Sequence, residues 1–241
     1  MKLLNKLIRF ISFLITMWYK VNRIMMRPNG VEKQVRPKTR NPWANTVGYY
    51  PLNTDFDDYS WNSRNLTNTN ATITTLGGVS CAYYWGNAYS TYTGYSLIRD
   101  ARTTSVWMNP SDLTDWVILQ PSAYNVSPRW SMTTAVRWGD IMMADNNSIS
   151  IDYSWTIGNW YHVVGTQEGS TVKMYVNWTL IWTKTRPSYS TPNWWRLWAQ
   201  FTAAAAAKYV GYISNAILEN KVWTAQEILD YYNQTKANYW L

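Results

Sequence analysis

The chain of 241 residues is long enough for one large all-β domain or two small domains, and it can bury a core without disulfide bonds. Hydrophobic residues make up 46% of it and charged residues 15%, which excludes a disordered polymer and a collagen-like fibre. One cysteine and one histidine exclude a disulfide framework, a cysteine-rich zinc site and any mechanism that needs two imidazoles.

The net charge of +8 is concentrated at the N-terminus. Residues 1–40 hold ten basic residues and one acidic residue, whereas the rest of the chain holds twelve basic and thirteen acidic residues. A surface that attracts nucleic acid or an anionic membrane is therefore expected only in this N-terminal arm. We expect no nucleic-acid binding through the rest of the chain.

The arm contains an apolar run from Phe10 to Tyr19 between basic residues. The run has the length of a signal-peptide core, and a full membrane span needs about 20 residues. A signal, an uncleaved anchor, a surface helix and a segment that packs on the body or on a partner chain all stay open. Residues 27–45 are rich in Pro, Asn and charge, which is typical of a linker. We predict an arm or anchor with its linker at 1–45 and a folded domain at 46–241.

From residue 47 the chain has short stretches rich in Tyr, Trp, Val, Ile and Thr, interrupted about every 8 to 12 residues by turn-forming residues. This spacing is typical of an all-β fold, an antiparallel β-sandwich or jelly roll. The predicted strands are 47–50, 72–76, 95–98, 103–108, 116–120, 131–137, 148–154, 160–168, 171–176, 179–185 and 209–218. One short C-terminal helix is predicted at 224–233, where Thr224 and Glu227 have the spacing of a capping box. Alternation along the strands predicts that the space between the sheets is filled by Trp107, Trp160, Val163, Tyr175 and Ile213.

Seven segments, in their order along the chain, resemble the concanavalin A-like lectin/glucanase superfamily in its laminin G-like branch. They are 48–53 (GYYPLN), 58–62 (DYSWN), 104–110 (TSVWMNP), 160–166 (WYHVVGT), 172–177 (VKMYVN), 211–215 (GYISN) and 224–228 (TAQEI). The resemblance covers about residues 47–236 and implies an antiparallel β-sandwich of the concanavalin A-like kind. It implies less about function, because this fold hosts lectins, adhesion modules, virion proteins and hydrolases.

Tryptophan stands at several positions where this family normally carries glycine. Physical reasoning agrees at Trp178, because Asn177 and Trp178 join two predicted strands as a two-residue turn in which both residues need a positive φ. Glycine adopts that conformation freely, whereas tryptophan is strained by it. The chain also holds 17 Trp and only 11 Gly.

We therefore hypothesise that the native gene reads the codon UGA as glycine, as some bacterial lineages and their phages do. In this hypothesis the sequence was translated with a code that reads UGA as tryptophan. The affected positions are Trp61, Trp178, Trp182, Trp194 and Trp195. Genuine tryptophans on an aromatic binding surface remain the alternative.

The glutamates argue against a hydrolase of this fold. Members that cleave β-glucans use two glutamates on one strand, with carboxyl groups about 5 to 5.5 Å apart in a retaining mechanism. The four glutamates here are predicted in the linker, at a hairpin, near a strand end and in a helix cap. We therefore expect a protein that is not an enzyme, and a glycoside hydrolase is disfavoured. His162 and Cys81 are predicted to be core residues of their strands.

Two kinds of binding site are predicted. The resemblance implies a calcium ion at the sandwich rim, and the acidic turn of Asp55, Asp57 and Asp58 would supply oxygen ligands, although Asp is also an ordinary turn residue. A glycan site needs a planar aromatic ring beside Asn or Asp. The candidates for that site are Tyr84, Trp85, Asn87, Trp138, Asp145 and Asn146.

We expect the protein to be a non-enzymatic binding module that recognises a carbohydrate or surface polymer in adhesion or surface display. It would then be extracellular, at a cell surface or on a virion. The alternative is a structural component of a phage virion or surface assembly, such as a decoration or tail-type protein. In that case residues 1–45 would contact neighbouring subunits or a second copy of the chain.

Overall fold

The computed structural model describes residues 44–86, 88–92, 101–112, 116–122, 133–137, 140–144, 149–151, 153, 155–185, 194–197 and 209–241. The chain divides into two units, and all of these residues lie in the second, Pro42–Leu241. The predicted arm at 1–45, apart from its last two residues, and the predicted strand at 95–98 lie outside the described residues. Within the described residues, no helix is both long and apolar enough to cross a membrane.

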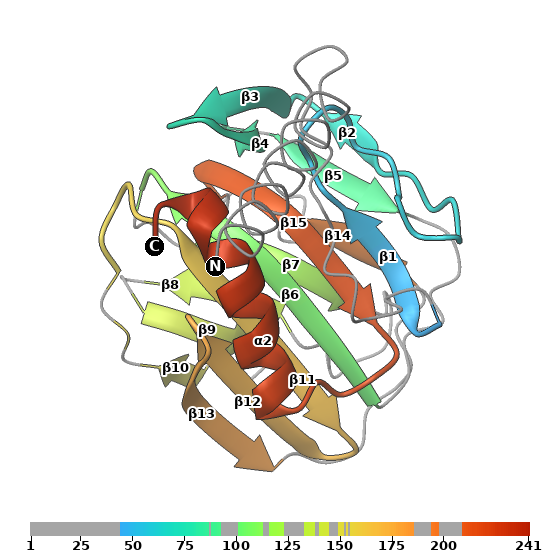
Figure 1. Ribbon diagram of the computed structural model, residues 1–241, viewed down its shortest axis with the longest axis vertical. Helices are drawn as coiled ribbons and strands as arrows, with labels where there is room; N and C mark the ends of the chain where they lie inside the picture. Colours follow the sequence, from blue (N-terminus) through green and yellow to red (C-terminus); the bar gives the residue numbers. More distant parts are fainter. Residues whose placement is uncertain are drawn as a thin grey trace, which may run out of the picture. The chain divides into compact units, whose positions relative to one another are not determined.

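Two antiparallel sheets make up the fold (Figure 1). The first has eight described strands, in the order β13 (Thr179–Thr185), β12 (Thr171–Val176), β11 (Tyr161–Glu168), β6 (Ala101–Pro110), β15 (Gly211–Glu219), β4 (Val79–Tyr84) and β3 (Thr72–Leu76), with β1 (Thr46–Tyr50) paired to β15. The second has seven, in the order β10 (Ile149–Ile151), β9 (Asp140–Ala144), β8 (Thr133–Arg137), β7 (Trp116–Ser122), β14 (Trp194–Leu197), β5 (Tyr89–Tyr92) and β2 (Thr67–Thr69). Every strand pair among the described residues is antiparallel, so the predicted sandwich is confirmed.

Several strand positions follow the sequence pattern closely. Three predicted strands, at Thr72–Leu76, Thr171–Val176 and Thr179–Thr185, have the observed bounds. The pattern does not predict β2, β5 and β14, because strands of three or four residues are too short to show a period. It also misses β9 and anticipates β4 only through Cys81.

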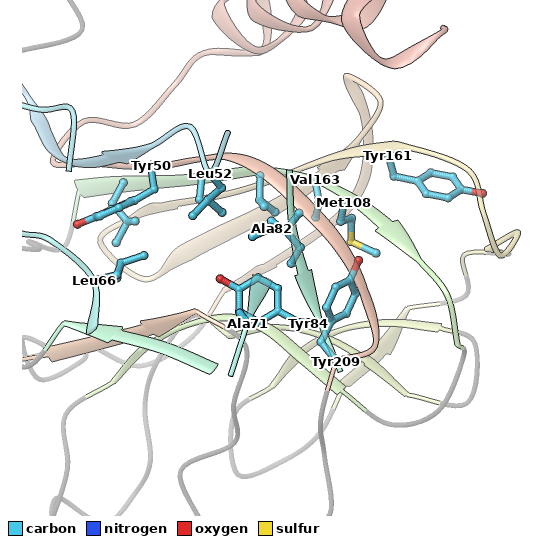
Figure 2. Close-up of a cluster of buried hydrophobic side chains, with 14 of the residues drawn as sticks. Tyr50, Leu52, Leu66, Ala71, Ala82, Tyr84, Met108, Tyr161, Val163 and Tyr209 are labelled. Carbon is cyan, nitrogen blue, oxygen red and sulfur yellow. The ribbon is translucent and has the colours of Figure 1, made fainter. Parts of the chain in front are cut away.

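Every second side chain of the central strands of the first sheet points into the core between the two sheets. Its central members are Val106, Met108, Val163, Met174 and Ile213. Figure 2 shows labelled side chains of this cluster in the layer between the strands of the two sheets. Tyr84 also links the layers, because its hydroxyl lies 3.0 Å from the Ser90 hydroxyl of β5 in the second sheet.

Helix α2 (Ala225–Thr235) and the following 3-10 helix η1 (Lys236–Tyr239) cover the opposite face of the first sheet (Figure 1). The Thr224 hydroxyl accepts a hydrogen bond from the Glu227 N–H, and the Glu227 carboxylate accepts one from the Thr224 N–H. This reciprocal pair satisfies two N–H groups at the start of the helix. The predicted capping box and helix are therefore confirmed.

Trp107 is the centre of this helix-side layer. Adjacent residues of a strand point to opposite faces, so Trp107 points away from its neighbours in the inter-sheet core and toward the helices. Its ring stacks on Tyr239 with centroids 3.9 Å apart and on Tyr232 with centroids 5.8 Å apart. Its Nε1–H donates a hydrogen bond to the Thr235 hydroxyl at 3.2 Å. The middle of the first sheet is therefore buried on both faces.

The five predicted core residues are all buried, but they occupy two layers. Val163 and Ile213 lie between the sheets, as predicted. Trp107, Trp160 and Tyr175 pack on the helix side, so their predicted place between the sheets is wrong. The physical reason is that β6, β11 and β12 are covered on both faces, and burial alone does not identify the layer.

Replacing Trp107 by Ala is expected to lower the free energy of unfolding by about 3–5 kcal/mol, because it empties a fully buried site stacked on Tyr239. Equilibrium unfolding in denaturant, followed by circular dichroism, measures this change. Trp61→Ala is the matched control, since that ring is 81% exposed and its loss should change stability by less than about 0.5 kcal/mol. A loss below about 1 kcal/mol for Trp107→Ala would contradict the layer described above.

His162 lies in β11 beneath the helices and is fully buried. Its Nε2 is 2.8 Å from the Ser105 hydroxyl, and its Nδ1 has no hydrogen-bond partner among the described residues. The imidazole also stacks on Trp107, with centroids 5.0 Å apart. Burial lowers the pKa of His162 to about 3, because the imidazolium would lose its hydration. His162 is therefore a neutral core residue, in the place that the strand pattern predicts.

Lowering the pH is expected to destabilise the protein through His162. In the folded state the imidazole stays neutral until the pH reaches about 3, whereas in the unfolded chain it binds a proton below about pH 6.5. The unfolded state binds more protons in this window, so the free energy of unfolding falls by about 1.4 kcal/mol per pH unit. Urea titrations at pH values from neutral to about 5 measure the slope. His162→Gln should show a smaller slope, and equal slopes in the two proteins would contradict this assignment.

Candidate ligand-binding site

Five segments of the chain meet at one end of the first sheet, which we call the loop end. Gly211 at the start of β15 pairs with Tyr84 at the end of β4 and with Pro110 at the end of β6. Backbone hydrogen bonds of 2.9 Å join the neighbouring loops, from the Ser111 N–H to the Val210 carbonyl and from the Gly158 N–H to the Pro110 carbonyl. The loop end consists of residues 85–86, 111–112, 155–160, 177–178 and 209–210.

Trp85 supplies an exposed aromatic ring at the loop end. It directly follows β4 and is 56% exposed. The Ala88 N–H donates to the Trp85 carbonyl at 2.9 Å, which closes a tight turn and fixes the backbone of Trp85. Gly86 has a φ of +55°, and a Cβ placed there would meet no atom within 4 Å, so the space beside the turn is open. A planar apolar ring on a fixed turn beside open space is suited to stacking on a ligand.

Tyr84 points the opposite way from Trp85, although the sequence predicts both as ligand contacts. Its ring is fully buried between the sheets, where its hydroxyl contacts Ser90. Burial raises the pKa of Tyr84 well above that of a free tyrosine, because the phenolate would lose its hydration. Consecutive residues of a strand take opposite sides, so only one of the two rings reaches the surface. Tyr84 is a structural residue.

The remaining predicted glycan contacts lie outside the described residues. They are Asn87, Trp138, Asp145 and Asn146.

The sequence reasoning missed two buried polar side chains at the loop end. Asn109, at the end of β6, donates from Nδ2 to the Gly158 carbonyl at 2.7 Å, while its Oδ1 has no partner among the described residues. The Nε1–H of buried Trp155 likewise has no partner within the described part of the chain, and its ring lies edge-on to Tyr161 with centroids 4.5 Å apart. Buried polar atoms normally have partners, so a buried water molecule is expected at each of the two atoms. The one signal in the sequence is that polar Asn109 directly follows the apolar residues Val106, Trp107 and Met108.

Ile157 adds an apolar side chain to the loop end. It lies in the loop before β11, next to Gly158, and is 52% exposed. In the first sheet β15 lies between β4 and β6, so two strand spacings of about 4.8 Å separate Trp85 from the end of β6. Ile157 lies in the loop that is hydrogen-bonded to the end of β6, and one ligand of a few sugar units can therefore reach both Trp85 and Ile157.

The β12–β13 hairpin also reaches the loop end and contains the predicted two-residue turn. Asn177 has a φ of +45° and Trp178 a φ of +69°, so the positive φ predicted at both positions is confirmed. The Asn177 N–H donates to the His162 carbonyl at 2.8 Å, and the Asn177 side-chain oxygen accepts from the His162 N–H at 2.9 Å. The turn is therefore anchored to β11, while Trp178 is 48% exposed.

The acidic turn after β1 uses its carboxylates to hold its own shape. Asp58 is buried, and it accepts hydrogen bonds of 2.8 to 2.9 Å from three backbone N–H groups, those of Tyr49, Ser60 and Arg64. Asp55 accepts one from the Asp57 N–H at 3.0 Å. Among the described residues, no three His, Cys, Asp or Glu side chains are grouped to hold a metal ion. Calcium binding by Asp55, Asp57 and Asp58 gains no support from this geometry.

The described glutamates lie away from the loop end. Glu168 and Glu219 pair with Ala101 and Thr103, at the start of β6, whereas the loop end lies at the other end of that strand. Glu219 is buried and accepts a hydrogen bond from the indole N–H of Trp223. Glu227 caps α2 and forms an ion pair with Lys221. Two of these three carboxylates thus serve the fold.

Cys81 is fully buried, as the sequence predicts, and it lies in the helix-side core. Burial raises the pKa of its thiol to about 12, because a thiolate would lose its hydration. The thiol therefore stays protonated and unreactive at neutral pH.

Solved structures similar to this one share the sandwich at low sequence identity. Domain 4 of AbnA, a GH43 extracellular arabinanase from Geobacillus stearothermophilus solved in complex with arabinotriose, has a TM-score of 0.64 and 15% identity, over 77% of this chain and 97% of that domain. A mutant Trypanosoma rangeli sialidase displaying trans-sialidase activity has a TM-score of 0.62 and 14% identity, over 81% of this chain and 33% of the sialidase.

The receptor-binding domain of botulinum neurotoxin type G is similar as well, with a TM-score of 0.57 and 13% identity over 79% of this chain. The match covers 51% of the toxin domain, so the chain spans about half of that structure and a third of the sialidase. At these identities the likeness shows the fold alone.

No curated protein sequence matches the chain. The family model described as the concanavalin A-like lectin/glucanases superfamily matches residues 85–229, from the exposed Trp85 to the middle of helix α2. The match covers more than half of the chain and agrees with the two antiparallel sheets, and the protein belongs to this superfamily.

Proposed function

We propose that the protein is a non-enzymatic binding module that recognises a carbohydrate or surface glycan at the loop end. The observation that carries the proposal is the exposed ring of Trp85, held on a tight turn beside open space. Sugar rings have apolar C–H faces that stack on planar aromatic side chains, and hydroxyl groups that need hydrogen-bond partners. The loop end offers both kinds of contact.

The polar part of this site is the side chain of Asn109, which is hydrogen-bonded to the Gly158 carbonyl. The Oδ1 of Asn109 is buried, so a water molecule would donate to it and link it to a sugar hydroxyl. Ile157 would cover a further apolar face of the ligand. Small binding sites commonly combine apolar contact area with a few fixed polar groups, which is the composition of the loop end.

Two of the similar structures support a ligand of this class. The arabinanase domain is solved with arabinotriose, a short oligosaccharide, and the neurotoxin domain is a receptor-binding domain. The sandwich thus carries binding sites in proteins that have little sequence in common with this one. The non-enzymatic part of the proposal is supported by the glutamates, since Glu219 and Glu227 are engaged in structural contacts away from the loop end.

The proposal places the domain in adhesion or display, at a cell surface or on a virion. The N-terminal arm, residues 1–45, would attach it there or join it to neighbouring subunits or a second copy of the chain. Its support is the sequence of the arm, which has an apolar run between basic residues.

Trp85→Ala is expected to weaken glycan binding at least about tenfold, because each stacked ring is worth one to a few kcal/mol. The measurement is titration calorimetry of the full chain against soluble polysaccharides that include arabinan, β-glucan and sialylated glycans, with and without EDTA. The melting temperature of Trp85→Ala should stay close to that of the parent protein, since the ring is exposed.

Trp61→Ala is the control for this experiment. Trp61 is also an exposed tryptophan, and its neighbour Asn62 donates to the Thr46 carbonyl, next to the end of β15 that is remote from the loop end. The affinity of Trp61→Ala for the polysaccharides should stay within about twofold of that of the parent protein. Equal binding by Trp85→Ala and the parent, or binding to none of the polysaccharides, would contradict the proposal. Loss of binding in EDTA would instead add a metal ion to the site.

A further inference from the structure

Two tryptophans adopt the left-handed backbone conformation that favours glycine. Trp178 has a φ of +69° and Trp240 a φ of +66°. In this region the Cβ atom of an L-residue approaches its own following carbonyl, and a non-glycine side chain is therefore strained. Among the described residues with positive φ, six are glycines, three are Asn, which tolerates this region better than most residues, and one is Ser.

Bulky residues keep this conformation when packing compensates for the strain, and Leu52 shows this case. Its φ is +57°, but its side chain is fully buried in the core between the sheets. Trp178 and Trp240 have less compensation than Leu52, since they are 48% and 76% exposed. Exposed rings supply little burial energy to offset the strain.

Each of the two positions has a local role in which glycine is the usual residue. Trp178 is the second residue of the two-residue turn between β12 and β13, where Asn-Gly is the preferred pair. Trp240 follows η1 as its left-handed C-terminal cap, and the next N–H, that of Leu241, donates back to the Lys236 carbonyl at 3.3 Å. Left-handed caps of helices are most often glycine.

We infer that positions 178 and 240 are glycine in the native protein and that both are encoded by UGA. The turn between β12 and β13 and the cap after η1 are unrelated in structure and lie about 60 residues apart in the sequence. In both, the largest residue stands where the smallest is expected. A single misread codon explains both. Trp61, Trp85 and Trp182 are also described and do not have a positive φ, so the backbone gives no such reason at those positions.

This inference changes the surface but leaves the proposed glycan site in place. With glycine at both positions, the native protein lacks the exposed rings of the β12–β13 hairpin and of the C-terminus. Trp85, whose φ lies outside the left-handed region, remains as an exposed tryptophan of the loop end.

The coding DNA and the protein from its native host provide the direct test. We expect UGA at codons 178 and 240, and peptides from the native protein with the masses that glycine gives at both positions. UGG at either codon, or a native peptide that contains tryptophan there, overturns the inference. Neither outcome affects the glycan-binding test of Trp85.

A second test measures the backbone directly, with pairs of variants of the full chain. Trp178→Gly and Trp178→Ala both remove the ring and differ by one methyl group, so their comparison isolates the cost of Cβ at positive φ. The glycine variant is expected to melt about 2 to 4 °C higher than the alanine variant, and the same difference is expected between Trp240→Gly and Trp240→Ala.

Trp85 provides the matched control pair, because its φ is not positive. There Trp85→Gly should melt at the same temperature as Trp85→Ala or lower, since glycine increases the entropy of the unfolded chain. Alanine variants that melt as high as the glycine variants at 178 and 240 overturn the inference.

Discussion

The requirement to bury both faces of the first sheet governs the structure. Its central strands β6, β11 and β15 run through the middle of the domain, with the second sheet on one side and helix α2 on the other. The two layers differ in chemistry. The layer between the sheets is mostly aliphatic, whereas the helix side combines large aromatic rings with buried polar groups.

The polar groups of the helix side determine where the helices dock. Asn215 donates from Nδ2 to the Tyr239 hydroxyl at 2.6 Å, and that hydroxyl donates to the Ser214 hydroxyl at 3.1 Å. The Tyr49 hydroxyl donates to the side-chain oxygen of Asn215 at 2.9 Å. An apolar interface tolerates sliding, but a buried network keeps its hydrogen bonds in only one arrangement. The irregularity in β15 that turns Asn215 toward this network therefore contributes to the position of η1.

The sequence was sufficient to predict the sandwich, the long strands and the capped helix, because alternation and capping are local patterns. It placed Trp107 in the wrong layer, since alternation says that a residue is buried but not which partner buries it. It predicted Tyr84 as a ligand contact for a similar reason. Tyr84 and Trp85 are adjacent aromatic residues, and the sequence does not tell which of the two is exposed. The burial of Asn109 was hard to predict, since its Nδ2 donates to the carbonyl of residue 158, far along the chain.

The order of the elements along the chain has a consequence for synthesis. The helices that cover the first sheet are made after all of its strands, because α2 and η1 follow β15 in the sequence. Until α2 and η1 have packed, the outer face of the sheet exposes Trp107, Val164 and Tyr175 to the solvent. An exposed apolar face of this kind promotes aggregation and binds chaperones. A chain truncated before α2 therefore lacks the cover that these residues need, and its exposed aromatic face is a physical basis for recognising it as incomplete.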